Sequence, residues 1–154
     1  MDLGLAGKKA IIVGGARGIG YAIAEVLARE GCELAISARS SDAVKDSVAN
    51  LKRYDTRVVG GAVDVKKPDA YRKWLEKAVE QLEGCDILIP ITSAGGGLGS
   101  EKYWEKAFEV DVLGPVRAVD LVLPHMVKRQ SGSIVLIATT SAGEAMGGHS
   151  LTMP

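Results

Sequence analysis

The eight residues VGGARGIG, Val13 to Gly20, lie between an apolar run and an alanine-rich segment with helical periodicity. A strand, a glycine turn and a helix in this order place unpaired N–H groups and the positive end of a helix dipole beside the turn, where phosphates bind. In this interpretation Gly14 permits the tight turn, Gly18 a close approach to a pyrophosphate, and Gly20 close packing of helix on strand. A purely structural turn is the alternative, but the flanking strand and helix favour a nucleotide site.

Apolar runs and segments of helical periodicity alternate along the whole chain. The expected strands are Ala10–Val13, Glu33–Ser37, Arg57–Gly61, Asp86–Ile89 and Ser133–Ala138. The expected helices are Gly18–Glu30, Ser41–Tyr54, Lys67–Leu82 and a long one from about Glu101 to Arg129. This alternation predicts βαβ units with right-handed crossovers, and therefore an α/β fold on a mostly parallel sheet. In the long helix, Gly114-Pro115 predicts a bend and Pro124 an end soon afterwards, because proline removes a backbone donor.

The composition is that of one globular domain, 1–154, in which residues 142–154 have the glycine-rich character of a disordered tail. Nineteen basic and nineteen acidic residues cancel without a dense basic block, which argues against nucleic-acid and anionic-membrane partners. No stretch is apolar for long enough to predict a signal peptide or a membrane span, so a cytoplasmic protein is expected. Cys32 and Cys85 match no metal-ligand spacing and are interpreted as reduced thiols, with a disulfide as the alternative.

The end of the second expected strand carries a second signal about the nucleotide. It reads AISARS, with Ala38, Arg39 and Ser40 where an acid would hold the ribose 2′-hydroxyl of NAD. Arg39 can form a bidentate pair with a 2′-phosphate, and Arg17 can approach the same phosphate from the glycine loop. This pattern predicts NADP(H) rather than NAD(H), with a solvated surface arginine as the alternative.

Several motifs together resemble the short-chain dehydrogenase/reductase family, in its NADP-preferring type. They are the spacing Gly14-x3-Gly18-x-Gly20, the pair Asp64-Val65 in GAVDVKKP, TSAGGG from Thr92 to Gly97, VDVLGP, LPHM and GSIVLIATTSAG. The resemblance covers essentially the whole chain. It implies a Rossmann-type doubly wound parallel sheet with about five strands in the order 3-2-1-4-5.

The resemblance also implies a set of residues that contact the dinucleotide, with Asp64-Val65 at the adenine. These residues are Gly14, Gly15, Ala16, Arg17, Gly18, Ile19, Gly20, Ala38, Arg39, Ser40, Asp64, Val65, Ser93, Ala94 and Gly95.

The implied activity is the interconversion of a carbonyl and an alcohol by hydride transfer from nicotinamide. In the family a tyrosine exchanges the proton, a lysine four residues later lowers its pKa, and a serine and an asparagine assist. Thr139 falls at the serine position, which Thr140 or Ser141 would take if the strand end is shifted, and Asp111 falls at the asparagine position. An ionised Asp111 accepts hydrogen bonds but cannot donate them.

The tyrosine and the lysine of the family are absent from these residues: no tyrosine follows Tyr103 and no lysine follows Lys128. We therefore expect an incomplete family fold, truncated before the Tyr-x-x-x-Lys motif and catalytically inactive, so that a small carbonyl substrate would bind only to a complete form. A non-catalytic NADP-binding or oligomerising module is the second reading, and a truncated product without function is the third.

Two apolar surfaces predict self-association. The strand SIVLIA would form a bare edge, a template for pairing with another chain, and the long fourth helix would lack cover for part of its apolar face. We expect a homo-oligomer that buries one or both of these surfaces.

Overall fold

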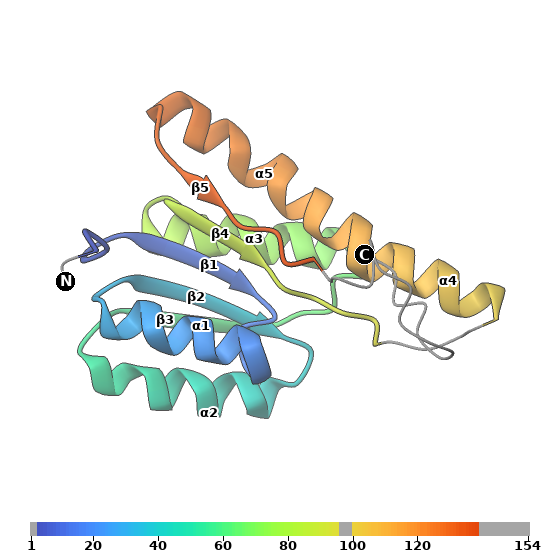
Figure 1. Ribbon diagram of the computed structural model, residues 1–154, viewed down its shortest axis with the longest axis horizontal. Coiled ribbons are helices and arrows are strands. Elements are labelled where there is room, and N and C mark those ends of the chain that lie inside the picture. Colours follow the sequence, from blue (N-terminus) through green and yellow to red (C-terminus); the bar gives the residue numbers. More distant parts are fainter. Residues whose placement is uncertain (1–2, 96–99, 139–154) are drawn as a thin grey trace.

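The computed structural model describes residues 3–95 and 100–138 and contains a five-stranded parallel sheet (Figure 1). Its strands are β1 (Lys9–Val13), β2 (Glu33–Ala38), β3 (Val58–Ala62), β4 (Ile87–Pro90) and β5 (Ser133–Ile134). They lie in the order β3-β2-β1-β4-β5, and every neighbouring pair is parallel. The predicted α/β class, the Rossmann-type sheet and its strand order are confirmed.

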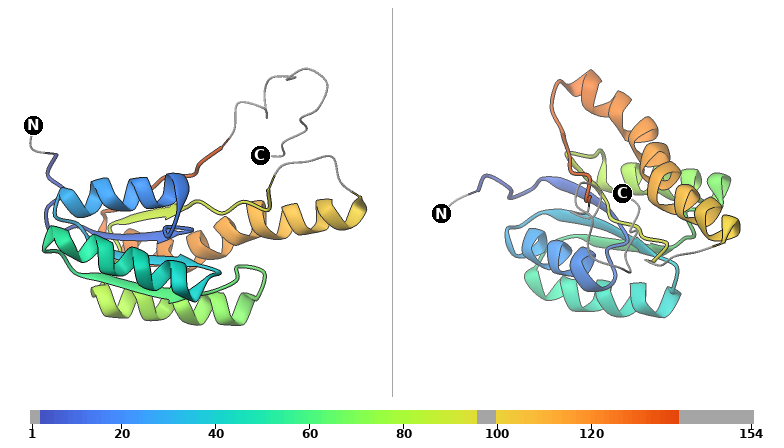
Figure 2. Two further views of the ribbon diagram at one scale, coloured as in Figure 1. Left: turned by 90° about the horizontal axis from the view of Figure 1, so that it is seen from below. Right: turned by 45° about the vertical axis from the view of Figure 1, so that its right-hand side comes forward.

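Helices cover both faces of this sheet (Figures 1 and 2). The helices are α1 (Gly18–Arg29), α2 (Ser41–Leu51), α3 (Pro68–Leu82), α4 (Glu101–Ala107) and α5 (Gly114–Arg129), with a short 3₁₀ turn, η1 (Lys52–Tyr54), after α2. One buried cluster joins α1 and α2 to the sheet, and the other joins α3 and α5 to its opposite face. Along β1 the side chains alternate between the two clusters, Ala10 and Ile12 facing one and Ile11 and Val13 the other.

The expected long fourth helix is irregular in its middle. Between α4 and α5 the chain forms a π-helical stretch, η2 (Phe108–Leu113), in which the N–H of Gly114 bonds to the carbonyl of Glu109, five residues back. A bend was expected at Gly114-Pro115; the structure has this π-helical stretch just before these residues, and Pro115 stands in the first turn of α5. α5 continues through Pro124 and ends at Arg129. Figure 2 shows that α4, at the start of this long helical segment, extends beyond the sheet.

The predicted fifth strand, Ser133–Ala138, is too long. β5 ends at Ile134, although the N–H of Val135 still bonds to the carbonyl of Leu88 at 3.0 Å. In a parallel ladder the next bond would be donated by the residue two positions beyond Leu88, and that residue is Pro90, which has no N–H. The ladder stops there, and the side chains of Val135, Leu136 and Ile137 are exposed.

Both cysteines are free and buried, so the disulfide alternative is wrong for this structure. Cys32 belongs to the cluster beneath α1 and α2, and Cys85 to the cluster beneath α3 and α5, on opposite faces of the sheet. Burial raises the pKa of Cys85 to about 12, which keeps this thiol protonated at neutral pH. Within the described residues, no helix has the length and apolar character that crossing a membrane requires.

Asp86 ties three elements together at the amino ends of the strands. Its carboxylate is buried, accepts the N–H of Lys9 at 2.9 Å, and pairs with the guanidinium of Arg129. Lys9 begins β1, Arg129 ends α5 and Asp86 directly precedes β4, so one side chain joins two neighbouring strands to α5.

Replacing Asp86 with alanine should lower the free energy of unfolding by about 2–4 kcal/mol, because a backbone donor and a guanidinium both lose their partner. Urea unfolding followed by circular dichroism measures this loss. Asp42→Ala is the matched control: its side chain is 92% exposed and lies 3.8 Å from Lys45, so the expected change is within about 0.5 kcal/mol. Equal losses in the two variants would show that Asp86 is not a structural tie.

Candidate functional site

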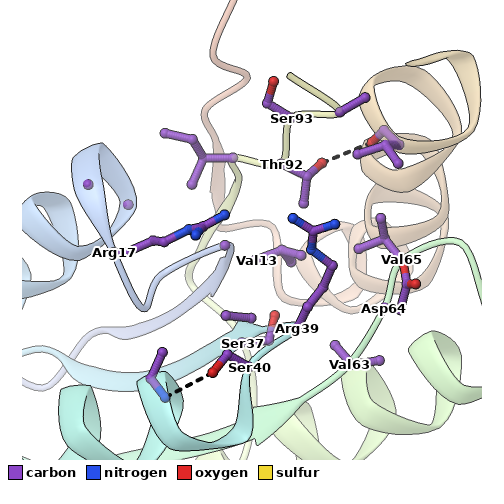
Figure 3. Close-up of a pocket in the computed structure, with 18 of the residues that line it drawn as sticks. Val13, Arg17, Ser37, Arg39, Ser40, Val63, Asp64, Val65, Thr92 and Ser93 are labelled. Carbon is purple, nitrogen blue, oxygen red and sulfur yellow. Dashed lines mark hydrogen bonds between the residues drawn. The ribbon is translucent and has the colours of Figure 1, made fainter. Parts of the chain in front are cut away.

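A cavity of about 780 Å³ lies at the carboxyl ends of β1, β2 and β4 (Figure 3). β1 stands between β2 and β4 in the sheet, so the chain order reverses beside it. Such a switch point is where open α/β sheets bind their ligands. The cavity is lined by Val13, Gly14, Arg17, Gly18, Ile19, Gly20, Ser37, Ala38, Arg39, Ser40, Ala43, Val63, Asp64, Val65, Lys66, Ile91, Thr92, Ser93, Ala94, Lys106 and Val110.

The turn from β1 into α1 forms one wall, and its glycines have the geometry expected from the sequence. Gly14 has φ +91°, and a Cβ there would lie 2.2 Å from the carbonyl oxygen of Ile91. A Cβ on Gly20 would lie 2.1 Å from the carbonyl oxygen of Gly14. The tight turn and the close helix–strand packing are thus confirmed. Gly18, with φ +55°, has open space where a Cβ would stand.

The amino end of α1 faces the same cavity. Arg17 precedes the helix in an extended conformation, and no side chain caps the first turn. The first N–H groups of a helix have no partner within the helix, so this end presents donors and a partial positive charge to whatever occupies the cavity.

Gly15 and Ala16, also expected at the nucleotide, lie behind the wall and do not line the cavity. The N–H of Gly15 bonds to the carbonyl of Ser37 at 2.9 Å, and the carbonyl of Ala16 accepts the buried hydroxyl of Ser47 at 2.9 Å. These bonds anchor the glycine turn to β2 and α2. The structure therefore gives Gly15 and Ala16 a supporting role in shaping the loop.

Basic side chains dominate the charges around the cavity. Arg17 and Arg39 are exposed, have no ion-pair partner among the described residues, and point into the cavity (Figure 3). Lys66 and Lys106 also belong to the lining, whereas Asp64 is the single acid that lines it among the described residues. One carboxylate among four cations makes the cavity electrostatically suited to an anion.

Ala38, Ser40, Asp64 and Val65 line the cavity as expected, from β2 and from the loop after β3. The hydroxyl of Ser40 accepts the N–H of Ala43 at 3.3 Å and so caps α2. The carboxylate of Asp64 accepts the N–H of Lys66 at 3.0 Å, which fixes the turn that follows β3.

The opposite wall is the segment after β4. Ser93 and Ala94 line the cavity, whereas Gly95 lies outside its lining. The hydroxyl of Thr92 donates to the carbonyl of Val110 at 2.9 Å, and the hydroxyl of Ser93 accepts the N–H of Gly95 at 3.1 Å. These bonds join residues of the wall to one another and attach the wall to η2.

Asp111, the residue at the asparagine position, does not line the cavity. Its carboxylate lies behind the wall and accepts the N–H of Ala94 at 2.7 Å. Burial raises the pKa of Asp111, while the bond from Ala94 and the positive charge of Lys106 lower it. Thr139, with its alternatives Thr140 and Ser141, and the tail 142–154 lie outside the described residues.

Several lining residues were not predicted from the sequence to contact the nucleotide: Val13, Ser37, Ala43, Val63, Lys66, Ile91, Thr92, Lys106 and Val110. Five of them stand at or within two residues of the carboxyl ends of their strands, a position that could have been used to find them: Val13, Ser37, Val63, Ile91 and Thr92. Lys106 gives no such signal, because it reaches the wall from α4 through a long-range contact. Within the described residues, no three His, Cys, Asp or Glu side chains gather so as to hold a metal ion.

Comparisons with known proteins agree with this geometry. The family model described as short chain dehydrogenase matches residues 8–151. The chain is 31% identical over 151 residues to human dehydrogenase/reductase SDR family member 4, covering 95% of this chain and 54% of that protein. It spans about half the length of the curated relatives that it matches.

Two solved structures show how far the likeness extends. L-sorbose reductase from Gluconobacter frateurii, solved with NADPH and L-sorbose, superimposes with a TM-score of 0.87 at 32% identity, over 96% of this chain and 58% of that one. A 7α-hydroxysteroid dehydrogenase solved with NADH and 7-oxoglycochenodeoxycholic acid gives 0.87 at 26% identity, over 92% and 57%. With the family model, these matches establish that the chain belongs to the short-chain dehydrogenase family.

Proposed function

We propose that the chain binds NADP(H) in this cavity and forms the dinucleotide-binding half of an oxidoreductase that interconverts carbonyls and alcohols. The observation that carries the proposal is the conjunction, at the switch point of the sheet, of an uncapped helix end with two arginines that have no ion-pair partner among the described residues. The two relatives solved with NADPH and NADH support a nicotinamide dinucleotide.

The cavity fits such a group in both shape and charge. A volume of about 780 Å³ lies within the usual range for ligand and cofactor sites. The missing Cβ at Gly18 leaves room for a pyrophosphate beside the first N–H groups of α1. Asp64 and Val65, across the cavity from α1 in Figure 3, would then lie at the adenosine end.

Selectivity for NADP(H) over NAD(H) follows from the charges at the end of β2. Arg39 stands there, and neither Ala38 nor Ser40 offers a carboxylate to bind a free 2′-hydroxyl. A guanidinium binds the extra phosphate through paired, charge-assisted hydrogen bonds, and Arg17 adds a second positive charge from the facing wall.

Arg39→Asp should weaken NADPH binding by about 10- to 100-fold, because a charge-assisted pair is replaced by like-charge repulsion. NADH affinity should be unchanged or improved, since the new carboxylate can accept the ribose hydroxyl. Isothermal calorimetry with both nucleotides measures the difference, and Arg29→Gln, on an exposed arginine at the far end of α1, is the control. Equal affinities of the wild-type chain for NADPH and NADH would overturn the 2′-phosphate argument.

Interconversion of a carbonyl and an alcohol needs more chemical groups than these residues provide. A bound nicotinamide supplies or accepts the hydride, and the protein must move a proton at the carbonyl oxygen. Asp111 is committed to the N–H of Ala94, and no tyrosine with a lysine four residues later follows the cavity wall in this sequence. We therefore propose that these 154 residues bind the dinucleotide without reducing carbonyls.

A steady-state assay of NADPH oxidation with a panel of ketones and sugars checks this proposal. The rate with the chain should equal the blank rate at nucleotide concentrations that saturate binding in calorimetry. Oxidation above the blank that disappears with Arg39→Asp would show that the chain carries its own acid–base group.

A second candidate function, an oligomerising module, is supported by the apolar surface. Val116, Leu123 and Val127 are exposed on α5 at spacings of seven and four, which place them on one face of the helix. A second apolar strip, Val135 to Ile137, follows β5 at the edge of the sheet. Each Å² of apolar surface that a second copy covers on either strip would stabilise the oligomer by about 25 cal/mol. We propose that the chain forms a homo-oligomer through one of them.

Light scattering at micromolar concentration should show a species larger than the monomer, and charged substitutions identify the surface. Val127→Asp should return the chain to a monomer if α5 forms the interface, and Leu136→Lys should do so if the sheet edge forms it, since burying an unpaired charge is unfavourable. Lys128→Ser, beside Val127, is the control. A wild-type chain that is strictly monomeric would contradict the proposal.

A further inference from the structure

Two oppositely charged side chains hold the backbone of one residue in the cavity wall, each through one of the two peptide groups that flank its Cα. The N–H of Ala94 donates to the carboxylate of Asp111 at 2.7 Å, and the carbonyl of Ala94 accepts from the ammonium of Lys106 at 3.0 Å. Ala94 and Lys106 both line the cavity. The backbone at this point therefore depends on a donor and an acceptor that come from two different residues.

The chemistry of Asp111 explains why its side chain bonds only to the N–H of Ala94 and leaves the carbonyl to another residue. An ionised carboxylate accepts hydrogen bonds only, whereas an amide at the same place would present an acceptor and a donor together. With aspartate at 111, the side chain that donates to the carbonyl of Ala94 comes from elsewhere, and it is Lys106.

The π-helical stretch explains how two residues five positions apart reach the backbone of the same residue. In a regular α-helix, at 3.6 residues per turn, they would point roughly 140° apart around the axis. η2 begins two residues after Lys106 and contains Asp111. Its turns are wider than those of an α-helix, because each hydrogen bond joins residues five positions apart. This geometry brings the two side chains to the side that faces Ala94.

We propose that Lys106 is a positioning residue, which holds the backbone at Ala94 jointly with Asp111 and thereby fixes the cavity wall for the dinucleotide. The effect on binding rests on the function proposed above, whereas the hold on Ala94 exists without a ligand. Lys106 acts through the backbone of the wall, and its contribution depends on which side chain stands at position 111.

A double-mutant cycle on the full 154-residue chain tests this dependence. The variants are Lys106→Met, Asp111→Asn and both together. Lys106→Met alone should speed amide exchange at Ala94 and weaken NADPH binding by about 3- to 10-fold each, because a carbonyl loses a charged donor. In the Asp111→Asn background the same change should have little effect, since the asparagine amide can donate to that carbonyl itself.

Lys102→Met is the matched control, because Lys102 is exposed on the same helix and has no hydrogen-bond or ion-pair partner among the described residues. Nuclear magnetic resonance measures exchange at Ala94, and calorimetry measures NADPH affinity. If Lys106→Met weakens NADPH equally in both backgrounds, Lys106 acts on the ligand's charge and the proposal is wrong. Unchanged exchange at Ala94 would also refute it. A wild-type chain that does not bind NADPH would refute the proposed function alone, since the exchange cycle can still be read.

Discussion

The close approach of three backbone segments at Gly14 is the constraint on which the cavity depends. Gly14 turns against the carbonyl of Ile91, and Gly20 packs against the carbonyl of Gly14, both at distances that leave no room for a Cβ. These contacts bring the amino end of α1 down onto the sheet between β1 and β4. A larger residue at position 20 would push α1 away from the turn, and one at position 14 would push the turn away from Ile91. Either change would move the first N–H groups of α1 from the space where β2 and β4 end.

The charges around the cavity then determine which kind of ligand it can hold. The helix end, two arginines and two lysines surround a single carboxylate, and that carboxylate bonds to its own turn. The sheet supplies shape through backbone contacts, while under the function proposed above a few exposed side chains would select between related nucleotides. Relatives with the same fold are accordingly found with either NADH or NADPH.

Much of the fold was predictable because its signals are local. Periodicity located all five strands and the helices between them, and the family resemblance supplied the strand order. The length of β5 was not predictable from its own apolar run, since Pro90 on the neighbouring strand ends the ladder. The glycine turn and Arg39 were found from short motifs. Lys106 was missed because it reaches the cavity wall through the carbonyl of Ala94, twelve residues earlier in the chain.

The proline that ends the ladder also changes how the cavity wall is built. Beyond Pro90 the chain is no longer paired with β5. The backbone groups of Ala94 and Gly95 instead bond to side chains from Ser93, α4 and η2. A wall made by a backbone ladder keeps its shape whatever its side chains are. A wall held by side chains can be reshaped one substitution at a time while the sheet stays the same.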